Sequence, residues 1–289
     1  MDIHIQHFFD PETSTLSYIV FDHASKDAVI IDSVLNYDPA SGNYSYESIE
    51  SLINFAEEQG LYVHYIMDTH AHADHVSGMD VLKARIPTAK TVIGKHIVKV
   101  QTVFSNFFNL KNFPCDGSQF DVLADEEHSL QAGSLEIQII FTPGHTPACA
   151  SYIIGNNIFV GDALFMPDFG TGRCDFPEGS AHELYHSIAK KIYTLDEHIN
   201  VYTGHDYMPG GRELAFTTTL AEQKQNNKHL KASTSEEEFI SFRTNRDREL
   251  AAPKLLLPSI QINIAAGIFP EAEDNGTSYL KLPLIPKSS

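Results

Sequence analysis

Potential metal ligands are concentrated in one short stretch of this 289-residue sequence, MDTHAHADHVSG, which runs from Met67 to Gly78. Within six consecutive residues it holds four candidates: His70, His72, Asp74 and His75. Side chains two residues apart point to nearly opposite sides of a helix, so His70 and His72 could not converge on one ion from a helix. A polar turn that only caps a helix needs one such residue and not four. The stretch therefore predicts a metal-binding loop.

The segments on either side of this loop predict a strand and a helix. LYVHYIM, residues 61–67, is rich in β-branched and aromatic residues, as strands are. VSGMDVLKARI, residues 76–86, has Val76, Met79 and Leu82 at helical spacing. The loop is therefore expected between two rigid elements, which is where binding residues are commonly presented.

Three more candidate ligands stand at the ends of expected strands: His145 in FTPGHTPAC, Asp162 in IFVGDALF and His205 in VYTGHDY. In each case a glycine comes directly before the candidate. Pro143 and Gly144 predict a tight turn that would direct His145 out of its sheet. Each residue alone could belong to an ordinary turn, but together with the loop they indicate one metal centre.

The remaining pattern predicts an α/β (α+β) fold, specifically an αββα sandwich of two sheets with helices outside. IHIQHFF, TLSYIVFD and DAVIID predict three strands in a meander. A helix should begin at Ser45 or Tyr46 and end at Gly60. A Rossmann fold is disfavoured because no glycine-rich turn opens a helix after the first strand.

We expect a catalytic domain over residues 1–211 and a C-terminal extension over residues 212–289 that packs on it. Residues 215–232 and 235–250 predict helices. Residues 252–286 are punctuated by proline and show no regular period, so irregular structure is expected there.

Composition limits the partners and the compartment. The net charge of −18 disfavours nucleic acids and anionic membranes, although a local pocket for a small anion stays open. The first residues show no signal peptide, and no apolar stretch approaches the roughly 20 residues of a membrane span. Cys115, Cys149 and Cys174 are too few for a disulfide framework, so a cytoplasmic protein is expected. A homodimer is left open.

THAHADH, PGHT, GD and GHD, in this order, resemble the motifs of the metallo-β-lactamase superfamily, over about Ile3 to Asp206. The resemblance implies up to two metal ions at one edge of the sandwich. It assigns one ion to His70, His72 and His145. It assigns the other to Asp74, His75 and His205, with Asp162 bridging.

FGTGRCDFPEGS, residues 169–180, resembles a loop of the persulfide dioxygenases, and the tail resembles a bacterial branch of β-lactamase-like hydrolases that groups with them. This implies one Fe(II) per chain on His70, His145 and Asp162, a set that leaves positions open for substrate and O₂. Around it would lie four residues that orient ligands and water: His72, Asp74, His75 and His205. The implied reaction oxidises glutathione persulfide with O₂ to sulfite and glutathione.

The same loop suggests Arg173 as the substrate anchor, because a guanidinium binds a carboxylate through two hydrogen bonds. The alternative for Arg173 is an ion pair with Asp175 or Glu178. Cys174 stands where such loops often carry threonine, and its thiol could be oxidised near the substrate.

Three other functions remain open. Glyoxalase II, a thioester hydrolase with two Zn or mixed Zn/Fe ions, uses the same ligand types. HELYH, residues 182–186, matches a zinc-protease motif, but Leu184, Ile188 and Ile192 predict a buried stripe that leaves His182 near solvent. The chain could also hold metal or sense persulfides without turnover. His229 and the other remaining histidines are expected to be ordinary surface or core residues.

Overall fold

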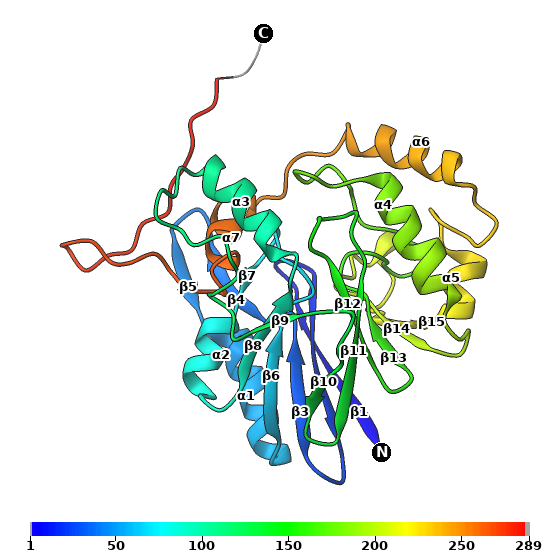
Figure 1. The fold of residues 1–289 in the computed structure, drawn as a ribbon, viewed down its shortest axis with the longest axis horizontal. Helices are drawn as coiled ribbons and strands as arrows, with labels where there is room; N and C mark the ends of the chain where they lie inside the picture. Colours follow the sequence, from blue (N-terminus) through cyan, green and yellow to red (C-terminus); the bar gives the residue numbers. More distant parts are fainter. Residues whose placement is uncertain (1, 287–289) are drawn as a thin grey trace.

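A computed structural model describes residues 2–286 of the chain. It contains two six-stranded sheets packed face to face, with helices on their outer sides and a small three-stranded sheet beside them (Figure 1). This is the αββα sandwich predicted from the sequence.

The first sheet combines the N-terminal meander with three parallel strands. Its strands, in spatial order, are β1 (Ile3–Asp10), β2 (Thr15–Asp22), β3 (Asp27–Ile31), β6 (Tyr62–Met67), β8 (Lys90–Gly94) and β9 (Val122–Ala124). β1, β2 and β3 pair antiparallel, whereas β6, β8 and β9 extend the sheet in parallel. Every residue of β2 is buried, as expected for a strand covered on both faces.

The second sheet is mainly antiparallel. Its strands, in order, are β10 (Leu130–Ala132), β11 (Leu135–Phe141), β12 (Ala150–Ile154), β13 (Asn157–Phe159), β14 (Asn200–Tyr202) and β15 (Thr217–Thr219). Only β13 and β14 pair in parallel. The small third sheet consists of β5 (Asn43–Ser45), β4 (Val34–Asp38) and β7 (Val76–Ser77).

The helices fall into two groups, one on each outer side. The first sheet is flanked by α1 (Glu47–Gln59), α2 (Met79–Arg85) and α3 (Ile97–Phe107). On the second lie α4 (Ala181–Tyr185), which continues into the π-helical turn η1 (His186–Lys191) and the 3-10 turn η2 (Ile192–Thr194), and α5 (Leu220–Asn226). The C-terminal part adds the turn η3 (Pro209–Gly211), α6 (Glu236–Asp247) and α7 (Leu256–Asn263).

Three apolar layers hold this arrangement together. One lies between the two sheets and includes Tyr18, Met67 and Tyr152. The other two lie between each sheet and its helices. Burial of apolar surface stabilises the layers by about 25 cal/mol per Å², so the packed sheets give a rigid platform for the loops at their edge.

Three local predictions differ from the structure. The helix expected from Val76 begins at Met79, because Val76 and Ser77 first pair with β4. The helix expected over residues 215–232 is only α5, and it follows strand β15. The tail expected to be irregular contains α7, with Ile260 and Ile262 fully buried.

The division of the chain at residue 211 stays a prediction. Beyond it, β15 pairs with β14 and completes the second sheet.

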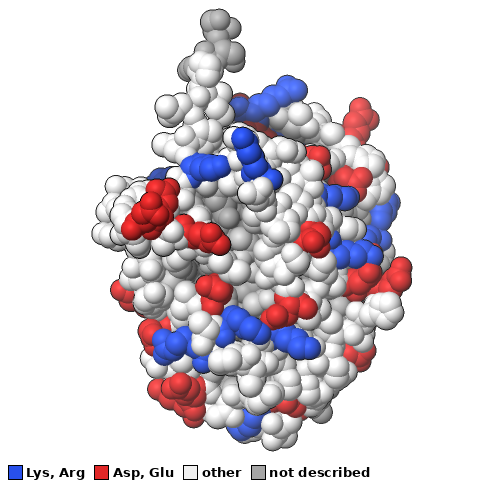
Figure 2. Space-filling view, turned by 60° about the vertical axis from the view of Figure 1, so that its left-hand side comes forward, with Lys and Arg blue, Asp and Glu red and all other residues white. Residues whose placement is uncertain are grey.

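Among residues 2–286, no helix has the length and apolar character needed to cross a membrane. On the face shown in Figure 2, basic side chains are interspersed with acidic ones.

Candidate metal centre

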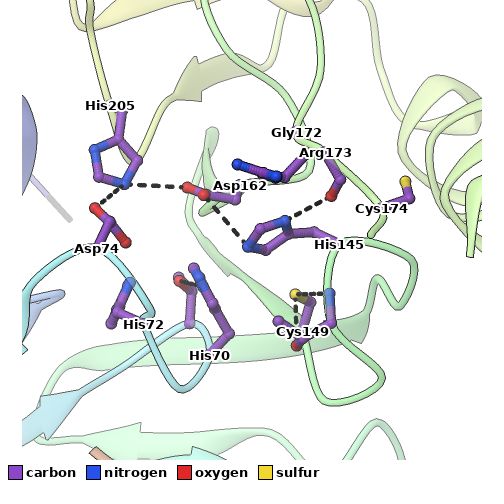
Figure 3. Close-up of polar contacts among 12 residues, drawn as sticks. His70, His72, Asp74, His145, Cys149, Asp162, Gly172, Arg173, Cys174 and His205 are labelled. Atoms are coloured by element: carbon purple, nitrogen blue, oxygen red, sulfur yellow. Dashed lines mark hydrogen bonds and ion pairs between the residues drawn. The ribbon is translucent and has the colours of Figure 1, made fainter. Parts of the chain in front are cut away.

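The candidate ligands follow strand ends of both sheets and meet at one edge of the sandwich (Figure 3). The loop from His70 to His75 follows β6 of the first sheet. His145, Asp162 and His205 follow β11, β13 and β14 of the second sheet. The two packed sheets therefore determine how closely these side chains approach.

Two histidines and a carboxylate form the first group. The ligand atoms of His70, His145 and Asp162 all lie within 4.8 Å of one another. All three side chains are buried. Asp162 Oδ2 is 3.5 Å from His145 Nε2. Because His70 follows a strand of the first sheet and the other two follow strands of the second, the group joins the two sheets.

A second group lies beside the first. The ligand atoms of His72, Asp74 and His75 also lie within 4.8 Å of one another. His205 stands between the groups, with its Nε2 3.1 Å from Asp74 Oδ2 and 3.4 Å from Asp162 Oδ1. The structure thus brings together every ligand candidate from the sequence; their individual roles stay predictions.

In most of these histidines one ring nitrogen is hydrogen-bonded to the surrounding protein, and the other is directed into the site. His145 Nδ1 donates to the carbonyl oxygen of Arg173 at 2.7 Å, and His205 Nδ1 donates to that of Ser14 at 3.1 Å. A carbonyl accepts only from a protonated nitrogen, so Nε2 of each ring keeps its lone pair for a metal. His70 Nδ1 lies 3.0 Å from Thr69 Oγ1.

His72 has the opposite orientation. Its Nε2 lies 3.1 Å from Asp32 Oδ1, which leaves Nδ1 for the site. The buried Asp32 also accepts hydrogen bonds from the backbone nitrogen and the hydroxyl of Thr69, at 2.7 and 2.9 Å. Asp32 therefore fixes the start of the histidine loop. Asp32 was not among the residues predicted from the sequence, although an acidic residue at the end of the apolar run DAVIID was a signal.

The donor set fits a bound cation. Five buried polar atoms of the site have no hydrogen-bond partner within residues 2–286: His70 Nε2, His72 Nδ1, Asp74 Oδ2, His75 Nε2 and Asp162 Oδ1. Unpaired buried polar atoms are costly and rare in folded proteins. Imidazole nitrogens and carboxylate oxygens suit zinc and ferrous iron, and a metal ion would satisfy these atoms.

The protonation states also favour a cation. Burial, followed by the neighbouring His72, holds the pKa of His70 well below its ordinary value. Burial and then His75 do the same to the pKa of His72. Burial opposes ionisation of Asp74, but His205 and His75 outweigh it and hold the pKa of that carboxyl well below its usual range. Neutral imidazoles at His70 and His72 and a charged carboxylate at Asp74 are forms that bind metal. At His205, burial lowers the pKa, but the Asp74 and Asp162 carboxylates outweigh it and raise the pKa.

Glycines before two of the ligands allow this close approach. Gly144 has φ 138°, and a Cβ there would lie 2.3 Å from the backbone nitrogen of Leu184. Gly161 has φ 50°, and a Cβ there would lie 2.5 Å from Thr69 Oγ1. Both conformations favour glycine. The pattern of a strand, a glycine and a ligand therefore has a steric cause.

Helix α6 holds the loop that carries Arg173. Arg243 Nη1 donates to the carbonyl oxygens of Thr171 and Gly172, at 3.1 and 3.2 Å. Asp247 Oδ2 accepts from the backbone nitrogen of Cys174 at 2.7 Å. Both α6 side chains are buried and pair with each other at 2.7 Å. Only their spacing of four residues was visible in the sequence.

His229 supports the same loop from a partly buried position. Its Nδ1 accepts a hydrogen bond from the backbone nitrogen of Thr171 at 3.1 Å. Burial, followed by the nearby Arg243, lowers the pKa of His229 to about 4. The ring therefore stays neutral near pH 7 and can act as this acceptor.

Asn263, at the end of α7, braces the histidine loop from the other side. Its Nδ2 donates to the carbonyl oxygens of His72 and His75, both at 2.8 Å. Its Oδ1 accepts from the backbone nitrogen of Ser77, also at 2.8 Å. Asn263 is only 1% exposed, so these bonds are protected from water. The sequence analysis missed this residue.

Arg173 makes the ion pair that was its alternative assignment. Its Nε and Nη2 donate to the two carboxylate oxygens of Asp175, at 2.5 and 2.6 Å, and Nη1 donates to the carbonyl oxygen of Ala251 at 2.8 Å. Its role as a substrate anchor stays a prediction. Cys174 is buried, and burial raises the pKa of its thiol, which disfavours the easily oxidised thiolate.

A cavity of about 490 Å³ opens beside Asp162. Aromatic side chains line it, namely Phe165, Phe169, Tyr207 and Phe242. Its wall also carries four cations: Arg173, Lys228, Arg243 and Arg246. Within residues 2–286, Lys228 and Arg246 form no ion pair, so their charges are available to a ligand.

Comparisons with known proteins agree with this geometry. The family model described as the metallo-beta-lactamase superfamily matches residues 10–205. "Glyoxylase B2" of Dictyostelium discoideum is 50% identical over 97% of this chain and 96% of its own length. Mouse "Persulfide dioxygenase ETHE1, mitochondrial" is 30% identical over 91% of this chain and 89% of its own.

Among solved structures, that of ETHE1 from Myxococcus xanthus superposes with a TM-score of 0.74. It is 32% identical and covers 92% of this chain and 100% of its own. Fold, ligand arrangement and family match lead to one assignment. The chain belongs to the metallo-β-lactamase superfamily.

Proposed function

We propose that the chain is a glutathione-dependent persulfide dioxygenase that uses one Fe(II) to oxidise glutathione persulfide with O₂, giving sulfite and glutathione after hydrolysis by one water molecule. The observation that supports this most is the grouping of His70, His145 and Asp162, with ligand atoms within 4.8 Å of one another. A ferrous ion held by two histidines and a carboxylate supplies open positions where substrate and O₂ react. The similarity to mouse persulfide dioxygenase gives further support.

The chain's own residues would prepare the site before substrate arrives. The carbonyl of Arg173 and the hydroxyl of Thr69 fix the rings of His145 and His70, so little reorganisation is needed on metal binding. The aromatic wall of the cavity would give the substrate apolar contacts beside the metal ligands.

The cations of the cavity wall suit the carboxylates of glutathione. Lys228 and Arg246 are exposed and have no carboxylate partner in the described chain. Arg173 remains our candidate anchor, although it would have to share its guanidinium with Asp175. The volume of about 490 Å³ falls within the range of small-molecule sites, roughly 300–1,000 Å³.

A second candidate is a glyoxalase II-type hydrolase of glutathione thioesters with two Zn or mixed Zn/Fe ions. It is favoured by the free donor atoms on His72, Asp74 and His75, which could hold a second ion. The 50% identity to "Glyoxylase B2" also supports the hydrolase.

Metal analysis combined with two assays distinguishes the candidates. After anaerobic reconstitution with Fe(II), we expect one iron per chain and O₂ uptake with glutathione persulfide. Two zinc ions held at the candidate centre, with thioester hydrolysis and no O₂ uptake, would replace this proposal by the hydrolase. Bound iron without either activity would favour a protein that holds metal or senses persulfides.

The compartment and assembly remain part of the proposal. All three cysteines, Cys115, Cys149 and Cys174, are free thiols. This supports the cytoplasm as the compartment, because reducing surroundings keep thiols unpaired. A homodimer stays a prediction.

A further inference from the structure

Three potential ligands meet on the surface, outside the candidate metal centre. His182 lies in α4 and His186 one turn later, and their ring centroids are 4.5 Å apart. Glu236 begins α6, which packs beside α4 (Figure 1). The Nε2 atoms of His182 and His186 lie 3.2 and 3.1 Å from the same oxygen, Glu236 Oε1. The ligand atoms of all three residues lie within 4.8 Å of one another.

These distances are close to those of a zinc site. Two ligand atoms on a tetrahedral zinc ion with bonds of about 2.0–2.1 Å are separated by about 3.3–3.4 Å. The observed separations from Glu236 Oε1 are only a few tenths of an ångström shorter. The three side chains are 38–58% exposed, so they can move by that amount, and water can complete the coordination.

We propose that His182, His186 and Glu236 form a second metal site, for Zn²⁺ or a similar transition-metal ion. Two imidazole nitrogens and one carboxylate oxygen favour such ions over Mg²⁺, which prefers oxygen ligands. The buried stripe of Leu184, Ile188 and Ile192 fixes α4 and η1 on the core and directs both histidines outwards. The competing explanation is that protonated histidines simply pair with Glu236.

An ion here would connect two segments that both contact the candidate metal centre. α6 carries Arg243 and Asp247, which hold the loop of residues 171–174. α4 begins after Ser180, whose backbone nitrogen donates to the carbonyl oxygen of Gly144, the neighbour of His145. Zinc would therefore strengthen the contact between the loop of residues 171–174 and the turn that carries His145. The proposal does not depend on which reaction the centre performs.

Calorimetric titration of the metal-loaded protein with Zn²⁺ tests the site. The wild type should bind one more equivalent than His182→Ala and Glu236→Gln. Loss of a direct ligand should weaken binding by more than the roughly 10- to 100-fold that loss of an outer partner costs. Elemental analysis after the titration checks that the centre keeps its metal, and Mg²⁺ should give no such equivalent.

His198→Ala is the matched control. His198 is an exposed histidine 3.0 Å from a single carboxylate, Asp196, and should have no effect on zinc binding. Zn²⁺ should also raise the melting temperature of the wild type and of His198→Ala, but not of the two site variants. Equal zinc stoichiometry and affinity in all four proteins would overturn the proposal. A second result would also overturn it: Glu236→Gln melts at a lower temperature than the wild type without zinc, and added zinc changes the melting temperature of neither the wild type nor Glu236→Gln.

Discussion

The ligand set and the cavity wall beside it are built in different ways. The candidate ligands lie in loops that follow strands, and the packed sheets position these loops. The loop of residues 171–174, in contrast, is held by Arg243, which is 72 residues from Thr171 in the sequence. The metal chemistry therefore depends on local turns at strand ends, whereas the shape of the cavity depends on the C-terminal part. Mutations in the two regions should have different consequences.

The largest effect is expected in the ligand set. His145→Ala should remove both iron and activity, because only His70 and Asp162 of the three proposed ligands would remain to hold the ion. Iron analysis and O₂ uptake measure this. His198→Ala, which replaces an exposed histidine whose ring pairs with Asp196, is the control and should keep both. Iron retention in His145→Ala at the wild-type level would show that the ligand set is assigned incorrectly.

The brace from α7 should affect stability next most strongly. Asn263→Ala removes a side chain that donates two hydrogen bonds to buried backbone carbonyls and accepts one from a backbone nitrogen. The free energy of unfolding should therefore fall by about 2–4 kcal/mol. Urea unfolding measures this change. Asn275→Ala is the control, because its amide makes only exposed contacts, with the Tyr279 hydroxyl and the backbone nitrogen of Thr277, and it should change stability by less than about 0.5 kcal/mol. Equal stability of the two variants would contradict a role for α7 in holding the loop.

In the cavity wall, Arg173→Ala should reduce kcat/KM for glutathione persulfide by roughly 10- to 150-fold while iron content is unchanged. This follows from the loss of a charge-assisted contact of about 1.5–3 kcal/mol. Arg173→Lys should recover only part, because an ammonium lacks the planar fork.

Asp175→Asn separates the anchor from the ion pair. It breaks the pair but keeps the guanidinium, so kcat/KM should be near the wild-type value if Arg173 binds substrate. If Arg173→Ala instead lowers the melting temperature and leaves kinetics unchanged, Lys228 and Arg246 become the candidates for the anchor.

The smallest effect concerns pH. Folding lowers the pKa of His229 from 6.5 to about 4, so between these values the unfolded chain binds the proton and the folded one does not. This contribution to stability is complete above pH 6.5 and is lost as the pH falls towards 4. His229→Asn keeps an acceptor for Thr171 but does not titrate, so its melting temperature should fall less over this interval. Parallel pH profiles would mean that folding does not lower the pKa of His229.

The sequence allowed the ligands and the sandwich to be predicted because their signals are local. A glycine after an apolar strand marks His145, Asp162 and His205, and α1 has recognisable start and stop residues. Both the family resemblance and the fold class were confirmed.

The supporting residues could not be predicted in this way. Asp32 acts on His72 across 40 residues and Asn263 across 191, and neither shows a local pattern. Helix α7 was missed because LLPSIQIN is apolar on most sides and has no helical period. Its Pro258 is tolerated because it lies in the first turn, where its missing N–H has no intrahelical partner.

The position of Asn263 in the chain has a consequence for the order of events during synthesis. Ribosomes add about 5–20 residues per second, so roughly 10–40 s pass between the synthesis of His72 and of its brace 191 residues later. During that interval the histidine loop lacks the hydrogen bonds that fix it. A nascent chain that stops before α7 would carry all the candidate ligands but not the brace that orders their loop. Stable metal uptake is therefore expected only after α7 has left the ribosome.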